Sequence, residues 1–163
     1  MSEPSSDDWY GVQWCSRHWW SRDYTLIAGA KTIASARFRG SRGTAVVAGR
    51  SYDLRRFRRR PISFITIRDS ANDELVACMR VVPMRGGFPA EFADGERFQW
   101  GRVKWWQSQW AWTNEAGETI LSSRRSLFPH RYYLHVERAA DKKTWPMLAL
   151  LELAMRELSP PWF

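Results

Sequence analysis

The sequence predicts a mainly β protein: a closed antiparallel barrel of about twelve strands around a buried C-terminal α-helix. Short apolar segments follow one another at regular spacing between residues 24 and 138, and tight turns join most of them. The chain then closes with a helical segment, 145–158, whose apolar side chains lie on every side rather than along one stripe. A closed barrel has no sheet edges and offers a partner to every face of such a helix, so one architecture explains both observations.

Length and composition predict one globular domain. The 163 residues suffice for a sizeable core, and we expect a disordered tail over 1–8 and a single barrel domain over 9–163. The acidic N-terminus lacks the apolar segment of a signal peptide, and two distant cysteines, Cys15 and Cys78, are typical of reduced thiols. We therefore expect a cytoplasmic protein, at most peripheral to the inner face of the membrane.

Turn residues delimit the expected strands. In chain order these strands cover 24–29, 31–38, 44–49, 51–57, 62–69, 74–82, 90–92, 96–103, 107–114, 118–125 and 131–138. Asp94-Gly95 and Glu115-Ala116-Gly117 are hairpin signals between neighbouring strands. The aromatic segment from Trp9 to Trp20 is open to two interpretations: an anchor at a membrane interface, or a first strand with a loop over one end of the barrel. We expect the second, because no other segment signals a membrane.

The closing helix has signals at both ends. Thr144 is the expected N-cap, Pro146 stands in the first turn, where its missing N–H costs nothing, and Pro160-Pro161 end the helix. Its apolar stretch of about fourteen residues, with Glu152 near the middle, is short of the roughly twenty that a bilayer core requires. Enclosed in the barrel, its large side chains contribute roughly 10–20 kcal/mol of gross burial.

A recurring unit runs through the chain: a strand, a turn with Asp or Gly, and a second strand. Examples are YTLIAGAKTIASARF, ISFITIRDSANDELVACMRVV and WAWTNEAGETILSSRR, and the chain ends on HVERAADKKTWPMLALLELAM. From about Tyr24 to Leu158 this order resembles the tubby C-terminal-like superfamily, in particular its small LURP-one-related and phospholipid-scramblase-like members. The resemblance implies a twelve-stranded barrel around a central helix, with phosphoinositide-headgroup binding or phospholipid association as its activity. No ligand-binding residue of the family maps onto a position of this sequence.

Positive charge is concentrated in one region of the chain. Between Arg37 and Arg68 ten arginines stand against one acid, Asp53, a local net of +9, so the rest sums to about −1 (8 − 9). The candidate ligand-binding residues in this region are Arg55, Arg56, Arg58, Arg59 and Arg60. Since Leu54 and Phe57 fall on opposite phases of a strand, we expect a bulge or turn to split the run and splay its guanidiniums from one end of the barrel.

Arginine is suited to this chemistry because its planar guanidinium binds phosphate with two hydrogen bonds. The same run is also typical of a solvated hairpin tip in an arginine-rich chain, and both interpretations stay open. Among the eleven tryptophans, Trp100, Trp110 and Trp112 are expected to fill the space between barrel and helix. One of Trp105 and Trp106 is expected to face solvent, because the two residues have opposite phases.

Residues that signal catalysis or metal binding do not form a recognisable set in this sequence. No Ser/His/Asp set, carboxylate pair, Gly-rich phosphate loop or metal-ligand spacing stands out, so no enzyme activity, metal or cofactor is expected. Because the helix fills the barrel, a ligand is expected on the outer wall or rims. The leading hypothesis is a non-enzymatic binding module for anionic phospholipid or another phosphate-bearing ligand. The alternatives are a nucleic-acid-binding domain that uses the same arginines with exposed tryptophans, and a scaffold or protein-interaction domain without a small ligand.

Overall fold

The computed structural model describes residues 11–16, 18, 20–82, 87–104, 108–125, 131–137 and 140–159. The expected tail, residues 1–8, and the pair Trp105 and Trp106 lie outside the described residues. The predicted fold class is confirmed: the strands close into an antiparallel barrel of twelve, and one C-terminal helix follows them.

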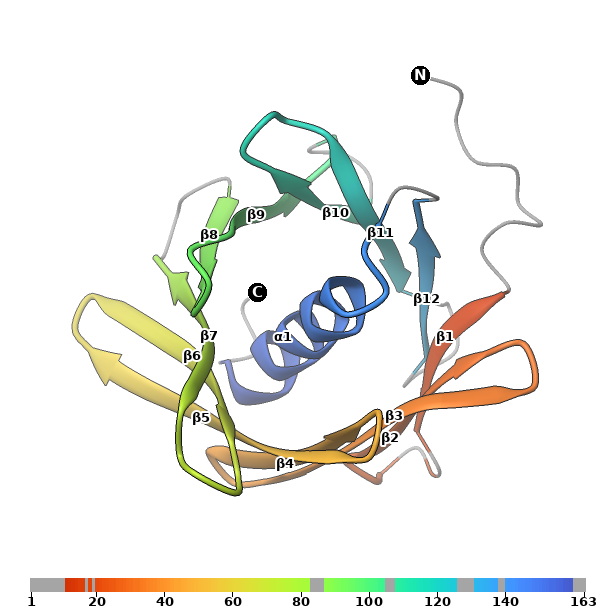
Figure 1. The fold of residues 1–163 in the computed structure, drawn as a ribbon, viewed down its shortest axis with the longest axis horizontal. Coiled ribbons are helices and arrows are strands. Elements are labelled where there is room, and N and C mark those ends of the chain that lie inside the picture. The colour runs from red at the N-terminus through yellow and green to blue at the C-terminus, as the bar shows by residue number, and fades with distance from the viewer. Residues whose placement is uncertain are drawn as a thin grey trace.

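The strands pair with their neighbours in chain order, and β1 pairs with β12 to close the ring (Figure 1). Their bounds are β1 Val12–Ser16, β2 Asp23–Ala28, β3 Lys31–Arg39, β4 Arg42–Val47, β5 Arg50–Arg59, β6 Ile62–Asp69, β7 Leu75–Val81, β8 Gly87–Phe92, β9 Arg97–Arg102, β10 Gln109–Asn114, β11 Thr119–Arg125 and β12 Arg131–Val136. Within the N-terminal aromatic segment, Val12–Ser16 form β1 and so belong to the barrel wall.

Helix α1, Thr144–Leu158, runs through the middle of the ring of strands (Figure 1). Its residues from Pro146 to Met155 are all buried, and Leu148, Ala149, Leu150 and Leu151 are 0 % exposed. The buried stretch from Pro146 to Met155 is longer than two helical turns of about 3.6 residues, so every side of α1 is covered. The helix and the inward-facing residues of the strands form one hydrophobic core.

Alternation along the strands directs one set of side chains inward. Trp14, Trp100 and Trp112 are fully buried, and Trp110 packs partly buried against Trp100 with ring centroids 4.1 Å apart. The structure therefore confirms the inward prediction for Trp100 and Trp112. Large aromatic rings fill the distance between the wall and the helix, which explains why so small a barrel carries so many of them.

Two expectations about local structure are wrong. Strand β5 does not break at the arginine run: it continues to Arg59, and its register with β6 shows no shift. Thr144 is the first residue of α1 rather than its N-cap. The N-cap position is Lys143, which makes no side-chain capping hydrogen bond. In the turn before the helix, the carboxylate of Asp141 accepts the N–H of Lys143 and the hydroxyl of Thr144.

Candidate anion-binding surface

The arginine run lies at the end of β5 and on the turn that follows. Arg55 and Phe57 take the outward phase of the strand, whereas Leu54 and Arg56 take the inward phase. Ordinary strand alternation thus divides the run between the two sides of the barrel wall, with no bulge. Of the five predicted residues, Arg58, Arg59 and Arg60 are exposed and Arg55 and Arg56 are half-buried.

Arg56 has a structural role inside the barrel. Its guanidinium donates to the main-chain oxygen of Leu158, 2.8 Å away, and to the hydroxyl of Ser63, 3.2 Å away. Burial, and then the charge of Arg58, lower the pKa of Arg56. A cation that donates to the last carbonyls of a helix satisfies groups without a helical partner and complements the negative end of the helix dipole. The structure therefore separates Arg56 from the other predicted ligand-binding residues.

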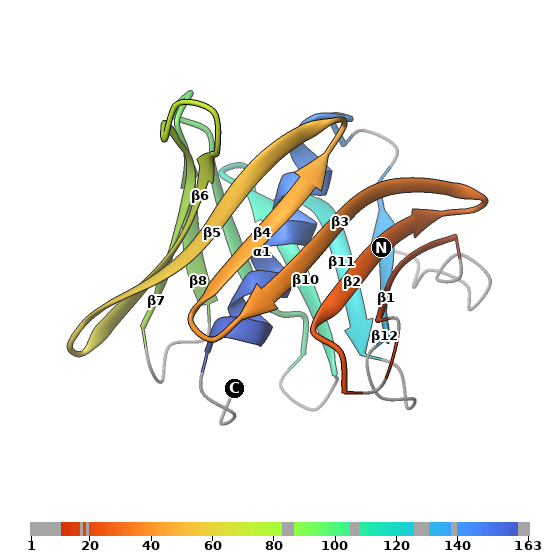
Figure 2. The same ribbon diagram turned by 90° about the horizontal axis from the view of Figure 1, so that it is seen from below.

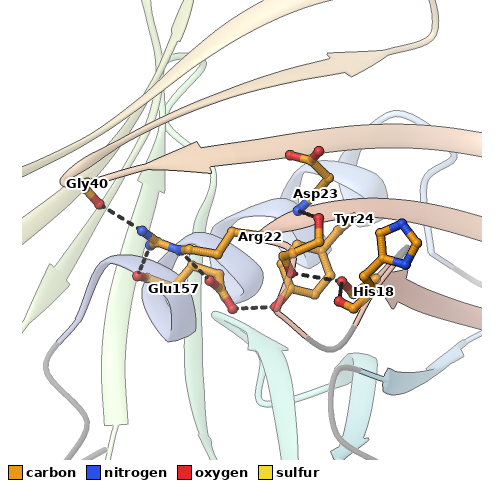
Figure 3. Close-up of polar contacts among 8 residues, drawn as sticks. His18, Arg22, Asp23, Tyr24, Gly40 and Glu157 are labelled. Atoms are coloured by element: carbon orange, nitrogen blue, oxygen red, sulfur yellow. Dashed lines mark hydrogen bonds and ion pairs between the residues drawn. The ribbon is translucent and has the colours of Figure 1, made fainter.

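A second set of contacts holds the same end of the helix (Figure 3). Arg22 donates to the carboxylate and the main-chain oxygen of Glu157, and also to the carbonyl of Gly40. The hydroxyl of Tyr24 donates to the other carboxylate oxygen of Glu157. Burial, and then this hydrogen bond, raise the pKa of Tyr24 far above its usual value. The C-terminal end of α1 is thus fixed to β2, the β3–β4 turn and β5.

A row of arginines crosses the outer wall beside this end of the helix. Arg39 on β3 lies directly opposite Arg42 on β4, and Arg42 lies directly opposite Arg55 on β5. Directly opposed side chains on one face of a sheet are about 5 Å apart at Cβ, and like charges in such pairs destabilise the sheet. Gly40 has a φ of +58° in the β3–β4 turn, which glycine adopts without strain and which closes this pair tightly.

Apolar and basic side chains extend this row towards the tip of the β5–β6 hairpin. On the outward phase, Phe57 lies opposite Phe64, and Phe64 lies opposite Arg80 on β7. Arg59 follows two residues after Phe57 and lies opposite Ile62. We call the set Arg39, Arg42, Arg55, Arg59 and Arg80 the arginine face.

The arginine face is not neutralised by the described residues. Each of Arg37, Arg50 and Arg68 forms an ion pair with a nearby aspartate. Within the described parts of the chain, no side-chain hydrogen bond or ion pair is found for any arginine of the arginine face. The charge of this surface is therefore available to an anion from outside the barrel.

Charge is also divided between the two ends of the barrel. The rim at the C-terminal end of α1, which we call the basic rim, lies at the bottom of Figure 2. Its described turns and strand ends carry Arg39, Arg42, Arg59, Arg60, Arg102, Lys104, Arg125 and Arg131, with Asp23 among them. The opposite rim, which we call the acidic rim, carries Asp73, Glu74, Asp94, Glu96, Glu115, Glu118, Glu137 and Asp141, with Lys31, Arg50, Arg97, Lys142 and Lys143 among them. This arrangement complements the helix dipole, because positive charge surrounds the C-terminal end of α1. It also gives the molecule a positive end and a negative end along the barrel axis.

Other features of the described residues offer little chemistry. Cys15 and Cys78 are free and half-buried, and burial raises the pKa of both thiols, which makes them less reactive. Across the described ranges, no cluster of His, Cys, Asp and Glu has the spacing of a metal site. A cleft of about 740 Å³ on the outer wall includes Phe64 and Arg80 and so borders the arginine face.

Sequence reasoning missed part of the arginine face. Arg39, Arg42 and Arg80 lie outside the run from 55 to 60, and strand pairing brings the first two beside Arg55. The available signal was the turn at Gly40-Ser41, because a two-residue hairpin loop places its flanking residues opposite each other.

Comparisons with known proteins leave the chain without an assigned family. In the part of the chain that is described, no helix has the length and apolar character needed to cross a membrane. No protein-family model, no curated protein and no solved structure matches the sequence or the fold. The resemblance to the tubby C-terminal-like superfamily therefore stays a prediction.

Proposed function

We propose that the protein is a non-enzymatic binding module for ligands that present several phosphate groups, in particular anionic phospholipid headgroups. The arginine face is the proposed site. The observation that carries the proposal is the row Arg39, Arg42 and Arg55, three cations on neighbouring strands without an acid partner among the described residues. Without a ligand, repulsion among the three guanidiniums weakens the sheet. The phosphates of a bound ligand pair with the guanidiniums and relieve this repulsion, which favours binding.

The size of the effect follows from the number of arginines. A basic residue close to an anionic lipid surface contributes about 1 kcal/mol, so the three residues of the row contribute about 3 kcal/mol. That free energy corresponds to roughly a hundredfold in affinity, because each 1.4 kcal/mol is tenfold. The contribution is electrostatic, so the affinity is expected to fall as salt is added.

The aromatic residues favour this ligand class over single-stranded nucleic acid. Sequence-tolerant binding of single strands uses exposed aromatic rings on which bases stack. Among the described residues, Trp100 and Trp112 are fully buried, and of the two aromatic residues beside the arginine face, Phe57 and Phe64, Phe57 alone is exposed, so successive bases have no series of rings there to stack on. These aliphatic and aromatic surroundings suit a lipid surface.

The test compares two variants with the same change of charge. In the first, Arg39, Arg42 and Arg55 are replaced by glutamine; in the second, Arg37, Arg50 and Arg68, which form ion pairs with aspartates, are replaced instead. Binding to inositol hexakisphosphate is measured by calorimetry, and binding to vesicles of phosphatidylserine and phosphatidylcholine by co-sedimentation. We expect the first variant to lose roughly a hundredfold in affinity and the second to lose far less. Equal losses in the two variants, or none in the first, would contradict the proposal.

A further inference from the structure

Exposed apolar side chains gather at the basic rim. Of the five large apolar residues with high exposure among those described, Trp20 at 66 %, Phe57 at 46 % and Val103 at 44 % lie at this rim, whereas Val46 at 43 % and Leu75 at 41 % lie towards the opposite one. Trp20 lies between β1 and β2, Phe57 near the end of β5, and Val103 directly after β9. Strands β1, β5 and β9 end, and β2, β6 and β10 begin, at the end of the barrel where α1 ends (Figure 2).

The barrel topology spaces these three positions evenly. In the closed ring, two strands separate the pair β1–β2 from β5–β6, two separate β5–β6 from β9–β10, and two complete the circle. A flat surface that approaches the basic rim therefore meets an apolar side chain from each third of the ring.

Basic residues flank two of the three. Val103 lies between Arg102 and Lys104, and Phe57 lies beside the arginine face. Apolar side chains interleaved with arginine and lysine are typical of protein segments that lie in the headgroup region of an anionic membrane. A soluble polyphosphate or a nucleic acid gains nothing from an exposed valine, so this pattern indicates a lipid surface.

We infer that the basic rim docks on an anionic membrane and inserts Trp20, Phe57 and Val103 into its interfacial layer, with the acidic rim turned away. The inference rests on the proposed function and specifies the source of its phosphates. The charges of the two rims favour this orientation, because the acidic rim is repelled by the same surface that attracts the basic rim. The arginine face meets the headgroups at the edge of the docked rim.

The experiment removes the apolar side chains and retains every arginine. One variant replaces Trp20, Phe57 and Val103 with serine, and its control replaces the exposed Val46 and Leu75, which lie away from the basic rim. Affinity is measured for phosphatidylserine–phosphatidylcholine vesicles and for soluble inositol hexakisphosphate. We expect the rim variant to lose at least about tenfold in affinity for vesicles and to bind inositol hexakisphosphate like the wild type. The control is expected to retain both affinities.

Each other outcome has a defined meaning. Unchanged vesicle binding by the rim variant, or an equal loss in the control, would overturn the inference. A loss of inositol hexakisphosphate binding in the rim variant would also overturn it, because the apolar residues would then be supporting the arginine face. Wild-type binding to inositol hexakisphosphate without binding to vesicles would overturn the inference and leave the proposed function standing. Binding to neither probe would overturn the proposed function itself.

Discussion

Replacement of Glu152 by leucine is expected to leave a buried cation without its carboxylate. Glu152 lies in the middle of α1 and is 3 % exposed. It accepts a hydrogen bond from Ser123 on β11, and its carboxylate pairs with Arg156 at 2.8 Å. The Arg156 guanidinium also lies over the rings of Trp100 and Tyr132, 5.3 and 4.9 Å from their centroids.

The structure sets the size of this effect. Removing one partner of a buried ion pair costs about 3–5 kcal/mol. The side chain of Arg156 is 16 % exposed and keeps two aromatic neighbours, so we expect the lower end, a loss of about 3 kcal/mol in the free energy of unfolding. With a urea dependence of about 2 kcal/mol per molar, the midpoint of unfolding falls by about 1.5 M.

A double variant tests whether the loss comes from the stranded charge. Replacing Glu152 with leucine and Arg156 with methionine removes both charges and keeps the volume apolar, so we expect stability within about 1 kcal/mol of the wild type. Urea unfolding followed by circular dichroism measures both variants. The reasoning is refuted if the single variant is as stable as the wild type, or if the double variant is no more stable than the single one.

Three further predictions concern the enclosed helix. Arg56→Met removes the donor to the main-chain oxygen of Leu158 and is expected to lower the free energy of unfolding by about 1–2 kcal/mol. Vesicle binding is expected to be retained. Loss of vesicle binding at unchanged stability would contradict the structural role of Arg56. The pKa of Tyr24 is raised in the folded protein, so above about pH 10 the unfolded chain loses the phenolic proton while the folded protein keeps it, and the free energy of unfolding falls as the pH rises further. Tyr24→Phe is expected to flatten this fall. An unchanged dependence of the free energy of unfolding on pH, measured by urea titrations at alkaline pH, would contradict the assignment. Leu150→Asp buries a charge on a side chain that is 0 % exposed and is expected to abolish cooperative thermal unfolding; a soluble variant that melts cooperatively would show that the helix is not enclosed.

The architecture could be predicted because its signals are local and repeated. Turn residues recur between segments with strand alternation, and the closing helix is apolar on every side. A closed wall satisfies both features, whereas the pairing of β1 with β12 was not predicted, because the aromatic segment before Tyr24 was open to two interpretations. The N-cap prediction was wrong because Thr144 is already the first helical residue, and local sequence does not fix a helix start to within one or two residues.

The candidate site depends on contacts between distant parts of the chain, and these were harder to predict. From the sequence, Arg56 was predicted to bind a ligand with the other arginines of the run. In the structure its guanidinium contacts the main-chain oxygen of Leu158, 102 positions later in the chain. Arginine serves equally well to bind a phosphate and to cap the C-terminal end of a helix. The two roles of Arg56 can therefore be distinguished only when the position of the C-terminal end of α1 is known. Pairing across β3, β4 and β5 likewise adds Arg39 and Arg42 to the surface that Arg55 alone indicated.

Hydrogen–deuterium exchange with and without anionic vesicles tests the central claim most directly, because it reports which end of the barrel meets the membrane. Exchange at strand ends and turns reflects local opening, which a bound surface suppresses. We predict that vesicles slow exchange at the β1–β2, β3–β4, β5–β6 and β9–β10 connections and leave the β6–β7 and β10–β11 turns unchanged. Protection of the acidic rim instead, or no protection at either rim under conditions of binding, would contradict the account.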